Sequence, residues 1–86
     1  MAVKKAVRLN HCVCPICQAS DPRHPERLRH QQINLLLSVM DARQRRLFAA
    51  YEADRMGLGG ISQVARITGL DRKTIWKGKK ELIGLQ

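Results

Sequence analysis

The sequence predicts an all-α fold, a small helix-turn-helix domain with an N-terminal zinc knuckle. A chain of 86 residues is long enough for one small hydrophobic core and too short for two. Only Phe48, Tyr51 and Trp76 are aromatic, so the core must be built from Leu, Ile, Val and Ala, which favours helices over sheets. Two short apolar segments separated by a glycine end the chain, and three cysteines gather near its start.

The N-terminal region divides from the rest at about residue 26. Residues 1–26 are expected to form a basic arm over residues 1–11 followed by a knuckle loop over residues 12–25, and residues 27–86 a helical domain. All three prolines lie in this first region. The last of them, Pro25, suits the first turn of a helix, which is expected to run to Met40.

The helix that follows Pro25 carries two apolar stripes, more than a lone surface helix needs. The members of the first are Leu28, Leu35, Leu36 and Val39, and those of the second are Ile33, Leu37 and Met40. We therefore expect residues 33–40 to dock against the rest of the domain, against a second copy of the chain, or against another protein.

The middle helix has clear start and stop signals. Asp41 is a good N-cap for a helix that begins at residue 42. Gly57 is expected to end that helix, and Gly59-Gly60 to prevent its continuation.

Two short helices with a glycine between them are typical of the DNA-binding helix-turn-helix. Ser62 is expected to cap the first, over residues 63–68, and Asp71 the second, over residues 72–83. Gly69 provides the positive φ angle that the turn needs, and Ala65 is small enough for a close crossing of the two helices. Apolar side chains should seal the pair: Ile61, Val64, Leu70 and Ile75.

The last helix is expected to be two-faced. At about 100° per residue, its basic side chains and Trp76 share one side, and Ile75, Gly78 and Leu82 the other. The predicted DNA-contacting residues are Arg72, Lys73, Thr74, Trp76, Lys77 and Lys80. Two alternatives to a DNA-contacting role remain. Trp76 could belong to the core, and Lys79 and Lys80 could be a solvated last turn. Gly78 inside a helix costs about 1 kcal/mol relative to alanine, which indicates close packing against the preceding helix.

The net charge of +9 indicates what kind of molecule the chain binds. A small domain this basic usually faces nucleic acid, although simple solubility is an alternative. We expect sequence-specific binding to double-stranded DNA. An RNA-binding module and a protein–protein adaptor are the rivals, but RNA readers usually expose an aromatic platform that this chain lacks. An enzyme is not expected, because no carboxylate lies near the cysteines at a spacing typical of zinc hydrolases or deaminases.

The cysteine segment predicts one structural zinc ion. Cys14-Pro-Ile-Cys17 has the spacing of a knuckle that points two thiolates at one metal. The expected ligands are Cys14, Cys17, His24 and His30, with Cys12 as the alternate ligand. Four protein ligands leave no open position for catalysis, and a bound ion stabilises a chain short of core. Free thiols or a redox-active pair are the alternatives.

Residues 36–82 resemble a known family. The segments "RQRRLFAAYEA", "GLGGI", "VARITGL" and "TIWKGKKEL" occur in this order and at similar spacing in the N-terminal region of bacterial insertion-sequence DDE transposases, the Rhodopirellula-type family. The resemblance implies a helix-turn-helix that binds the terminal repeats of a mobile element, normally followed by a catalytic domain. Asp71 stands where the family is expected to have serine, and it preserves the helix cap. The chain is thus expected to be a transposase DNA-binding region or a small stand-alone regulator or accessory factor.

The expected location is the cytoplasm. The basic N-terminal residues are not followed by an apolar segment typical of a signal peptide. The apolar run "INLLLSVM" is far shorter than the roughly 18 residues of a membrane span, so no membrane association is expected.

Overall fold

The computed structural model describes residues 9–19 and 21–86, and this part of the chain contains five helices and no strand. In chain order they are α1 (Pro15–Gln18), α2 (Pro25–Ser38), α3 (Ala42–Met56), α4 (Gly60–Thr68) and α5 (Arg72–Leu85). The predicted all-α class is confirmed. Residues 1–8, most of the basic arm expected at the start of residues 1–26, lie outside the described residues.

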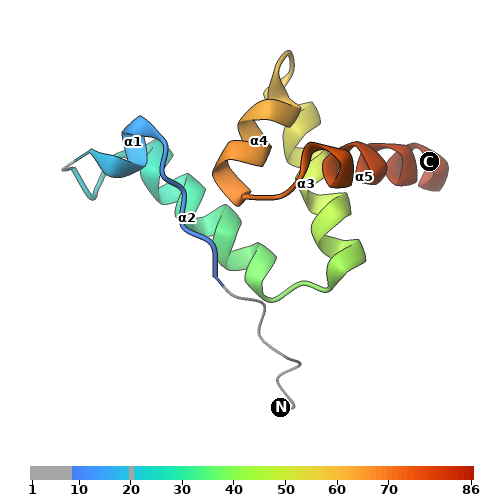
Figure 1. Cartoon of the computed structure of the whole chain (residues 1–86), viewed down its shortest axis with the longest axis horizontal. Helices are drawn as coiled ribbons and strands as arrows, with labels where there is room; N and C mark the ends of the chain where they lie inside the picture. The colour runs from blue at the N-terminus through green and yellow to red at the C-terminus, as the bar shows by residue number, and fades with distance from the viewer. Residues whose placement is uncertain (1–8, 20) are drawn as a thin grey trace.

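Helix α3 is the centre of the helix-turn-helix unit, and α4 and α5 pack on it (Figure 1). The core between these three helices consists of small and branched side chains: Ala49, Ala53, Val64 and Ile75. Ile61, Ala65 and Leu70 are partly buried against it. The predicted apolar seal of the two last helices is therefore present, and Ile75 is fully buried within it.

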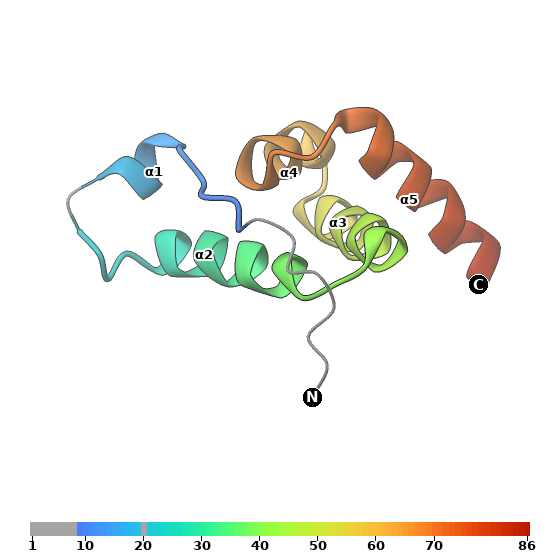
Figure 2. The same cartoon turned by 60° about the horizontal axis from the view of Figure 1, so that its bottom comes forward.

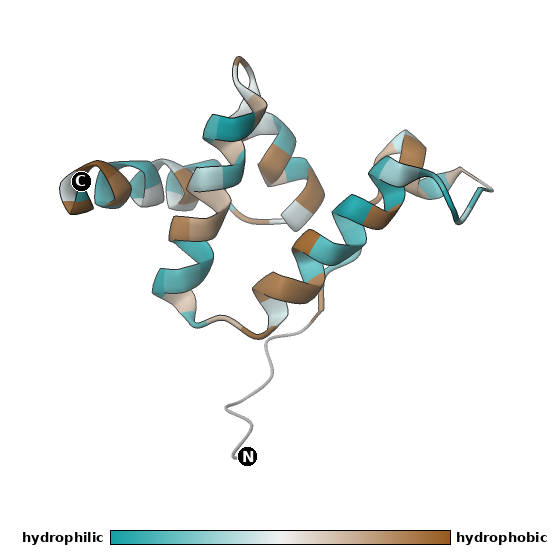
Figure 3. Cartoon of the chain, turned by 180° about the vertical axis from the view of Figure 1, so that it is seen from behind, coloured by the Kyte–Doolittle hydropathy of each residue, from teal (hydrophilic) through white to brown (hydrophobic). Residues whose placement is uncertain are grey.

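Helix α2 packs beside α4 through a second core cluster. Its buried members are Ile33, Leu37 and Ile67, and Met40 is partly buried against them. Ile33, Leu37 and Met40 form the second of the two apolar stripes predicted for this helix. The first stripe remains exposed: Leu28, Leu35, Leu36 and Val39 have between 43% and 80% of their surface accessible. Helix α2 thus buries one apolar face and leaves the other open. Figure 3 shows hydrophobic and hydrophilic positions alternating along this helix.

Four of the predicted caps and turns are confirmed, and the first of them is Gly57, the C-cap of α3, with a φ of +76°. Asp41 caps α3 in a full capping box, in which its side chain accepts from the amide of Gln44 and the Gln44 side chain accepts from the amide of Asp41. Asp71 caps α5 by accepting from the amide of Lys73 at 3.0 Å. Gly69 occupies the turn with a φ of +75°. These are short-range interactions that the local sequence specifies.

The prediction for the start of α4 is wrong. Ser62 does not cap this helix, which begins two residues earlier at Gly60 and has Gly59 as its N-cap, with a φ of +77°. The physical reason is the close approach of Gly60 to α3, where a Cβ atom would overlap the backbone carbonyl of Ala53. Glycine at this position thus begins α4 against its neighbour, while α3 ends before Gly59-Gly60 as predicted.

Smaller differences concern helix ends and one packing partner. Helix α2 ends at Ser38 because the amides of Val39 and Met40 turn back to the carbonyls of Leu36 and Leu37. Helix α5 continues to Leu85, beyond the predicted end at residue 83. Gly78 does mark a close approach, but to α3 instead of the immediately preceding helix α4. The knuckle loop predicted within residues 1–26 contains the single turn α1.

The molecule is flat, with extents of 41 × 39 × 19 Å. Figure 2 shows α1 and the segment before it lying over α2, at the opposite end from α5. No helix among the described residues combines the length and apolar character required to cross a bilayer.

Candidate metal centre and nucleic-acid interface

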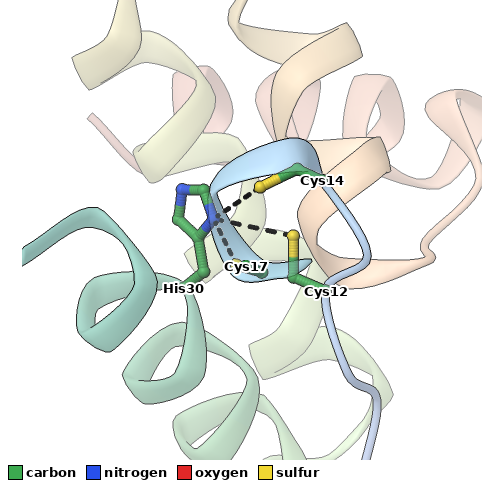
Figure 4. A group of neighbouring side chains, drawn as sticks. All are labelled: Cys12, Cys14, Cys17 and His30. Atoms are coloured by element: carbon green, nitrogen blue, oxygen red, sulfur yellow. Dashed lines mark hydrogen bonds between the residues drawn. The ribbon is translucent and has the colours of Figure 1, made fainter. Parts of the chain in front are cut away.

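Three thiols and one imidazole converge between α1 and α2 (Figure 4). The Sγ atoms of Cys12, Cys14 and Cys17 and a ring nitrogen of His30 all lie within 4.8 Å of one another. The Nδ1 atom of His30 is 3.5 Å from the Sγ of Cys12, 3.5 Å from that of Cys14 and 3.2 Å from that of Cys17. One imidazole nitrogen therefore faces three sulfur atoms.

The local sequence explains how the sulfurs meet. Cys14 is the N-cap of α1 and Cys17 lies three residues later, so the single turn brings both side chains to one face. Pro15 at the first position fits this turn because the amide it lacks would have no helical partner there. Cys12 precedes the turn in extended chain and approaches from a third direction (Figure 4).

His30 is presented by a regular helix. It lies in the second turn of α2 and is 7% exposed. Its other ring nitrogen, Nε2, is 3.6 Å from a carboxylate oxygen of Glu26, one turn earlier on the same helix. A metal-ligating histidine usually directs its second nitrogen at such an acceptor, which fixes the ring and the tautomer. Burial lowers the pKa of His30 from its ordinary value of 6.5, although the charge of Glu26 raises it.

The arrangement fits a tetrahedral metal ion better than a hydrogen-bond network. A neutral imidazole nitrogen offers either one N–H or one lone pair, so Nδ1 cannot bond three thiols at once. Zinc at about 2.3 Å from sulfur and about 2.0 Å from nitrogen would place ligand sulfur and nitrogen about 3.5 Å apart in a tetrahedron. The three sulfur–nitrogen distances of 3.5, 3.5 and 3.2 Å are close to that value.

The thiols perturb one another strongly. Burial, reinforced by hydrogen bonds with the neighbouring thiols, raises the pKa of Cys17 to about 12. Burial also raises the pKa of Cys12. Burial opposes ionisation of Cys14 as well, but hydrogen bonds from the backbone at Cys17 and from the other thiols outweigh it and lower its pKa. Three thiolates at these distances would repel one another unless a cation lay between them.

One predicted ligand lies elsewhere. His24 is the N-cap of α2, where its Nδ1 accepts a hydrogen bond from the amide of Glu26 at 3.1 Å. It does not belong to the cluster, and Cys12, the alternate ligand, takes its place. The predicted members Cys14, Cys17 and His30 are all present. The structure therefore brings together a three-cysteine, one-histidine set.

The second candidate site is the outer face of α5. Arg72, Lys73, Trp76, Lys77 and Lys80 are all exposed, and Thr74 is half-buried. Among residues 9–19 and 21–86, none of these four basic side chains forms an ion pair. Four positive charges thus lie on one helix face without a neutralising partner.

Trp76 does not belong to the core. Its side chain is 52% exposed, and the ammonium group of Lys79 lies 5.4 Å from the ring centroid. Lys79 also forms an ion pair of 3.0 Å with Asp54 of α3. Lys79 is therefore tied to the body of the domain, which distinguishes it from its free neighbours on the helix.

The opposite face of α5 fixes the helix to α3. Ile75 is fully buried, and Gly78 lies against the backbone carbonyl of Arg46 and the side chain of Ala50 in α3. Glu81 accepts hydrogen bonds from the guanidinium of Arg46, the shorter at 2.7 Å. This hydrogen-bonded pair lowers the pKa of Glu81. The basic face is thus carried by a firmly attached helix.

Two asparagines near the cysteine–histidine cluster were not predicted from the sequence. Asn10 and Asn34 both donate side-chain hydrogen bonds to the carbonyl of Ile67, near the end of α4. Asn34 is 3% exposed on the inner face of α2, between the buried apolar side chains of Ile33 and Leu37. A polar residue between Ile33 and Leu37 in that stripe is a sequence signal that would have identified it.

Comparison of the chain with protein-family models, with curated proteins and with solved structures finds no match.

Proposed function

We propose that this protein is a zinc-stabilised helix-turn-helix domain that binds double-stranded DNA and reads its sequence through α5. The observation that carries the proposal is the unpaired basic face of α5, displayed on a helix whose opposite side is packed on α3. The major groove admits an α-helix, and side chains there reach the base edges. Helix α5 has 14 residues. Arg72, Lys73 and Thr74 are at its N-terminal end, the end that contacts bases in this motif.

Zinc is the metal that the cluster fits best. Soft thiolates with one imidazole in a tetrahedron are typical of structural zinc sites. Such an ion would be held by Cys12, Cys14, Cys17 and His30, and it would supply positive charge and a cross-link. The four protein ligands complete its coordination, so the role is structural.

Duplex DNA is favoured over single-stranded RNA. Trp76 is the sole aromatic residue on the basic face of α5. Single-strand readers stack successive bases on several aromatic side chains, whereas phosphate contacts on a duplex require mainly positive charge.

A titration of affinity against salt tests this proposal. Neutralising about five phosphates predicts a slope of log affinity against log salt of about −4 to −5. Gel-shift measurements on a mixed-sequence duplex and on its separated strands provide the comparison. Tighter binding to the duplex with this slope supports the proposal, and a salt-independent affinity or a preference for single strands contradicts it.

We further propose a mobile-element setting for this function. It is supported by the resemblance of residues 36–82 to the terminal-repeat-binding region of bacterial DDE transposases. The chain would act as the DNA-binding region of such a transposase or as a small regulator, in the cytoplasm where bacterial DNA lies. Inverted repeats in the neighbouring genomic DNA that compete for binding in the gel shift would support this setting.

The open stripe on α2 indicates a protein contact, and we propose a second copy of the chain as its occupant. Leu28, Leu35 and Val39 follow one another at intervals of seven and four residues, the spacing of a helix-pairing seam. The exposed surface of these three side chains and of Leu36 together is roughly 400 Å². This is about half of the area that each partner buries in a standard interface. The four side chains of the stripe are apolar and carry no charge themselves, although the chain has a net charge of +9. A weak dimer would place two recognition helices on one DNA site.

A further inference from the structure

The carbonyl oxygen of Ile67 joins the metal-binding region to the helix-turn-helix. It accepts one hydrogen bond from Nδ2 of Asn10, at 3.1 Å, and another from Nδ2 of Asn34, at 2.9 Å. Ile67 lies in the last turn of α4, where backbone carbonyls have no helical partner. Two side chains from outside the helix-turn-helix therefore complete the end of its first helix.

Both asparagines lie within four residues of a member of the cluster in the chain. Asn10 is two residues before Cys12, in the extended segment that leads into α1. Asn34 is one helical turn after His30 on α2, so both side chains are on the inner side of that helix. Reversing the Asn34 amide would set two oxygens against each other, which fixes its orientation. Asn10 and Asn34 thus each connect the cluster to the end of α4 through a few residues of chain and one hydrogen bond.

Asn10 also touches the turn itself. Gly69 has a φ of +75°, and a Cβ built on it would be 3.0 Å from the side-chain oxygen of Asn10. The Asn10 side chain therefore lies against the segment that sets the angle between α4 and α5. Because α5 is about 21 Å long, a change of about 10° in that angle would move its far end by nearly 4 Å.

The segment that carries Asn10 is held mainly by the cluster and by the packing of Cys12 against the core cluster of Ile33, Leu37 and Ile67. Apart from the thiol–imidazole contacts, the described residues 9–19 make two side-chain hydrogen bonds to the rest of the described chain. One is the bond from Asn10, and the other runs from Arg27 to the carbonyl of Ala19 at 2.7 Å. A metal ion bound by Cys12 and His30 would tie this segment to α2 and so hold Asn10 on the turn.

We propose that Asn10 and Asn34 are positioning residues through which metal binding at the cysteine cluster sets the orientation of α5 for DNA. This inference rests on the proposed function. Metal would raise the affinity for duplex DNA without touching the DNA. Because the net effect of one hydrogen bond is a factor of roughly 2 to 13 in an equilibrium, loss of metal should weaken binding by roughly 10-fold.

The experiment uses the full chain, the zinc-loaded and chelator-treated forms, and the variant Asn10→Ala. Duplex affinity is measured by fluorescence anisotropy, and amide NMR shifts of Ile67 to Leu70 are recorded without DNA. We expect chelation to move these amide shifts and to weaken binding roughly 10-fold in the parent chain. Zinc-loaded Asn10→Ala should already be roughly 3- to 10-fold weaker, and chelation should weaken it little further.

The matched control is Arg27→Ala, which removes the other hydrogen bond of the same segment and leaves Ile67 untouched. Its ratio of zinc-loaded to zinc-free affinity should equal that of the parent chain. Equal affinity of the two parent forms, or a parent-like affinity of zinc-loaded Asn10→Ala, would overturn the inference. If no form binds duplex DNA, the proposed function fails, and the amide shifts then decide the coupling alone: unchanged shifts on chelation overturn it, and shifts reproduced by zinc-loaded Asn10→Ala support it.

Discussion

Gly78 in α5 lies directly against the backbone carbonyl of Arg46 in α3. A Cβ atom at this position would overlap that carbonyl and would be 3.2 Å from the Cβ of Ala50. The absent side chain allows the two helices to approach closely along the face opposite the basic residues. The helix that we propose reads DNA is therefore held by backbone contact as well as by apolar burial.

The first prediction is that Gly78→Ala destabilises the protein. In an open helix this substitution would stabilise by about 1 kcal/mol. Here the added carbon meets a backbone atom of a packed helix, and overpacking of this kind costs about 1 to 3 kcal/mol. We expect the unfavourable effect to win, because α3 and α5 must separate to accept the methyl group. Urea unfolding followed by circular dichroism measures the change.

Gly84→Ala is the matched control in the same helix. A Cβ at Gly84 meets nothing within 4 Å. This variant should be stabilised by up to about 1 kcal/mol. We thus expect Gly78→Ala to lower the free energy of unfolding and Gly84→Ala to raise it. Equal stabilisation of both variants would show that α3 and α5 are not in close contact.

The second prediction concerns the metal ligands. Cys12→Ser should lower zinc affinity by more than about 100-fold, since even residues that only orient a ligand contribute 10- to 100-fold. His24→Asn should bind zinc normally, because asparagine preserves the N-cap that His24 provides for α2. Native mass spectrometry and competition with a chromogenic chelator supply the stoichiometry and the affinity. The ligand set would have to be revised if His24→Asn lost the metal and Cys12→Ser kept it.

Local sequence predicted the features that depend on near neighbours. The Asp41 and Asp71 caps each involve atoms within three residues, and the exposure of Trp76 follows from helix periodicity alone. The choice between Cys12 and His24 depended on the path of the chain around α1, which the spacing of residues does not determine.

Contacts between distant segments could not be predicted in this way. Asn34 and Ile67 are 33 residues apart, and Arg46 and Glu81 are 35 apart. Such pairs meet because α2 packs on α4 and α5 on α3, and no local pattern specifies those crossings. Gly78 illustrates both cases: the sequence indicated a close approach, and only the fold identifies α3 as the partner.

The third prediction separates two kinds of DNA contact on α5. Lys77→Ala and Lys80→Ala should weaken binding to all duplexes alike, because lysines late in the helix are expected to contact phosphates. Arg72→Ala or Lys73→Ala should also reduce the preference for the selected site, by about 1 to 3 kcal/mol for a base contact. Affinities for a selected duplex and a scrambled one distinguish the two classes. Arg23→Ala, which removes an exposed charge far from α5 in the sequence, is the control and should have little effect.

The fourth prediction is a pH dependence of stability at Glu81. Hydrogen bonding to Arg46 lowers the pKa of Glu81 from its ordinary value of 4.5, so the unfolded chain binds its proton more readily than the folded one. The pair therefore stabilises the fold fully above pH 4.5 and less as the pH falls through the lowered folded-state pKa. Glu81→Gln should unfold at lower urea than the parent at pH 7, and the difference should shrink below pH 4.5. A difference that is constant with pH would exclude ionisation of Glu81 as its source.

The last prediction concerns self-association through α2. Val39 is 80% exposed and Leu35 53%, and together with Leu28 and Leu36 they form the apolar stripe that the chain itself leaves uncovered. The limited area predicts a weak dimer, populated at tens of micromolar or above, and more readily on a DNA site with two half-sites. Leu35→Lys combined with Val39→Lys should keep the protein monomeric without lowering its stability, since neither side chain belongs to the core. Sedimentation equilibrium of the parent chain and of the double variant measures the self-association.

Leu37→Ala is the contrasting variant. It removes a buried side chain and should lower the free energy of unfolding by about 2 to 5 kcal/mol. A parent chain that remains monomeric both at high concentration and on a two-half-site duplex would mean that the stripe does not bind a second copy.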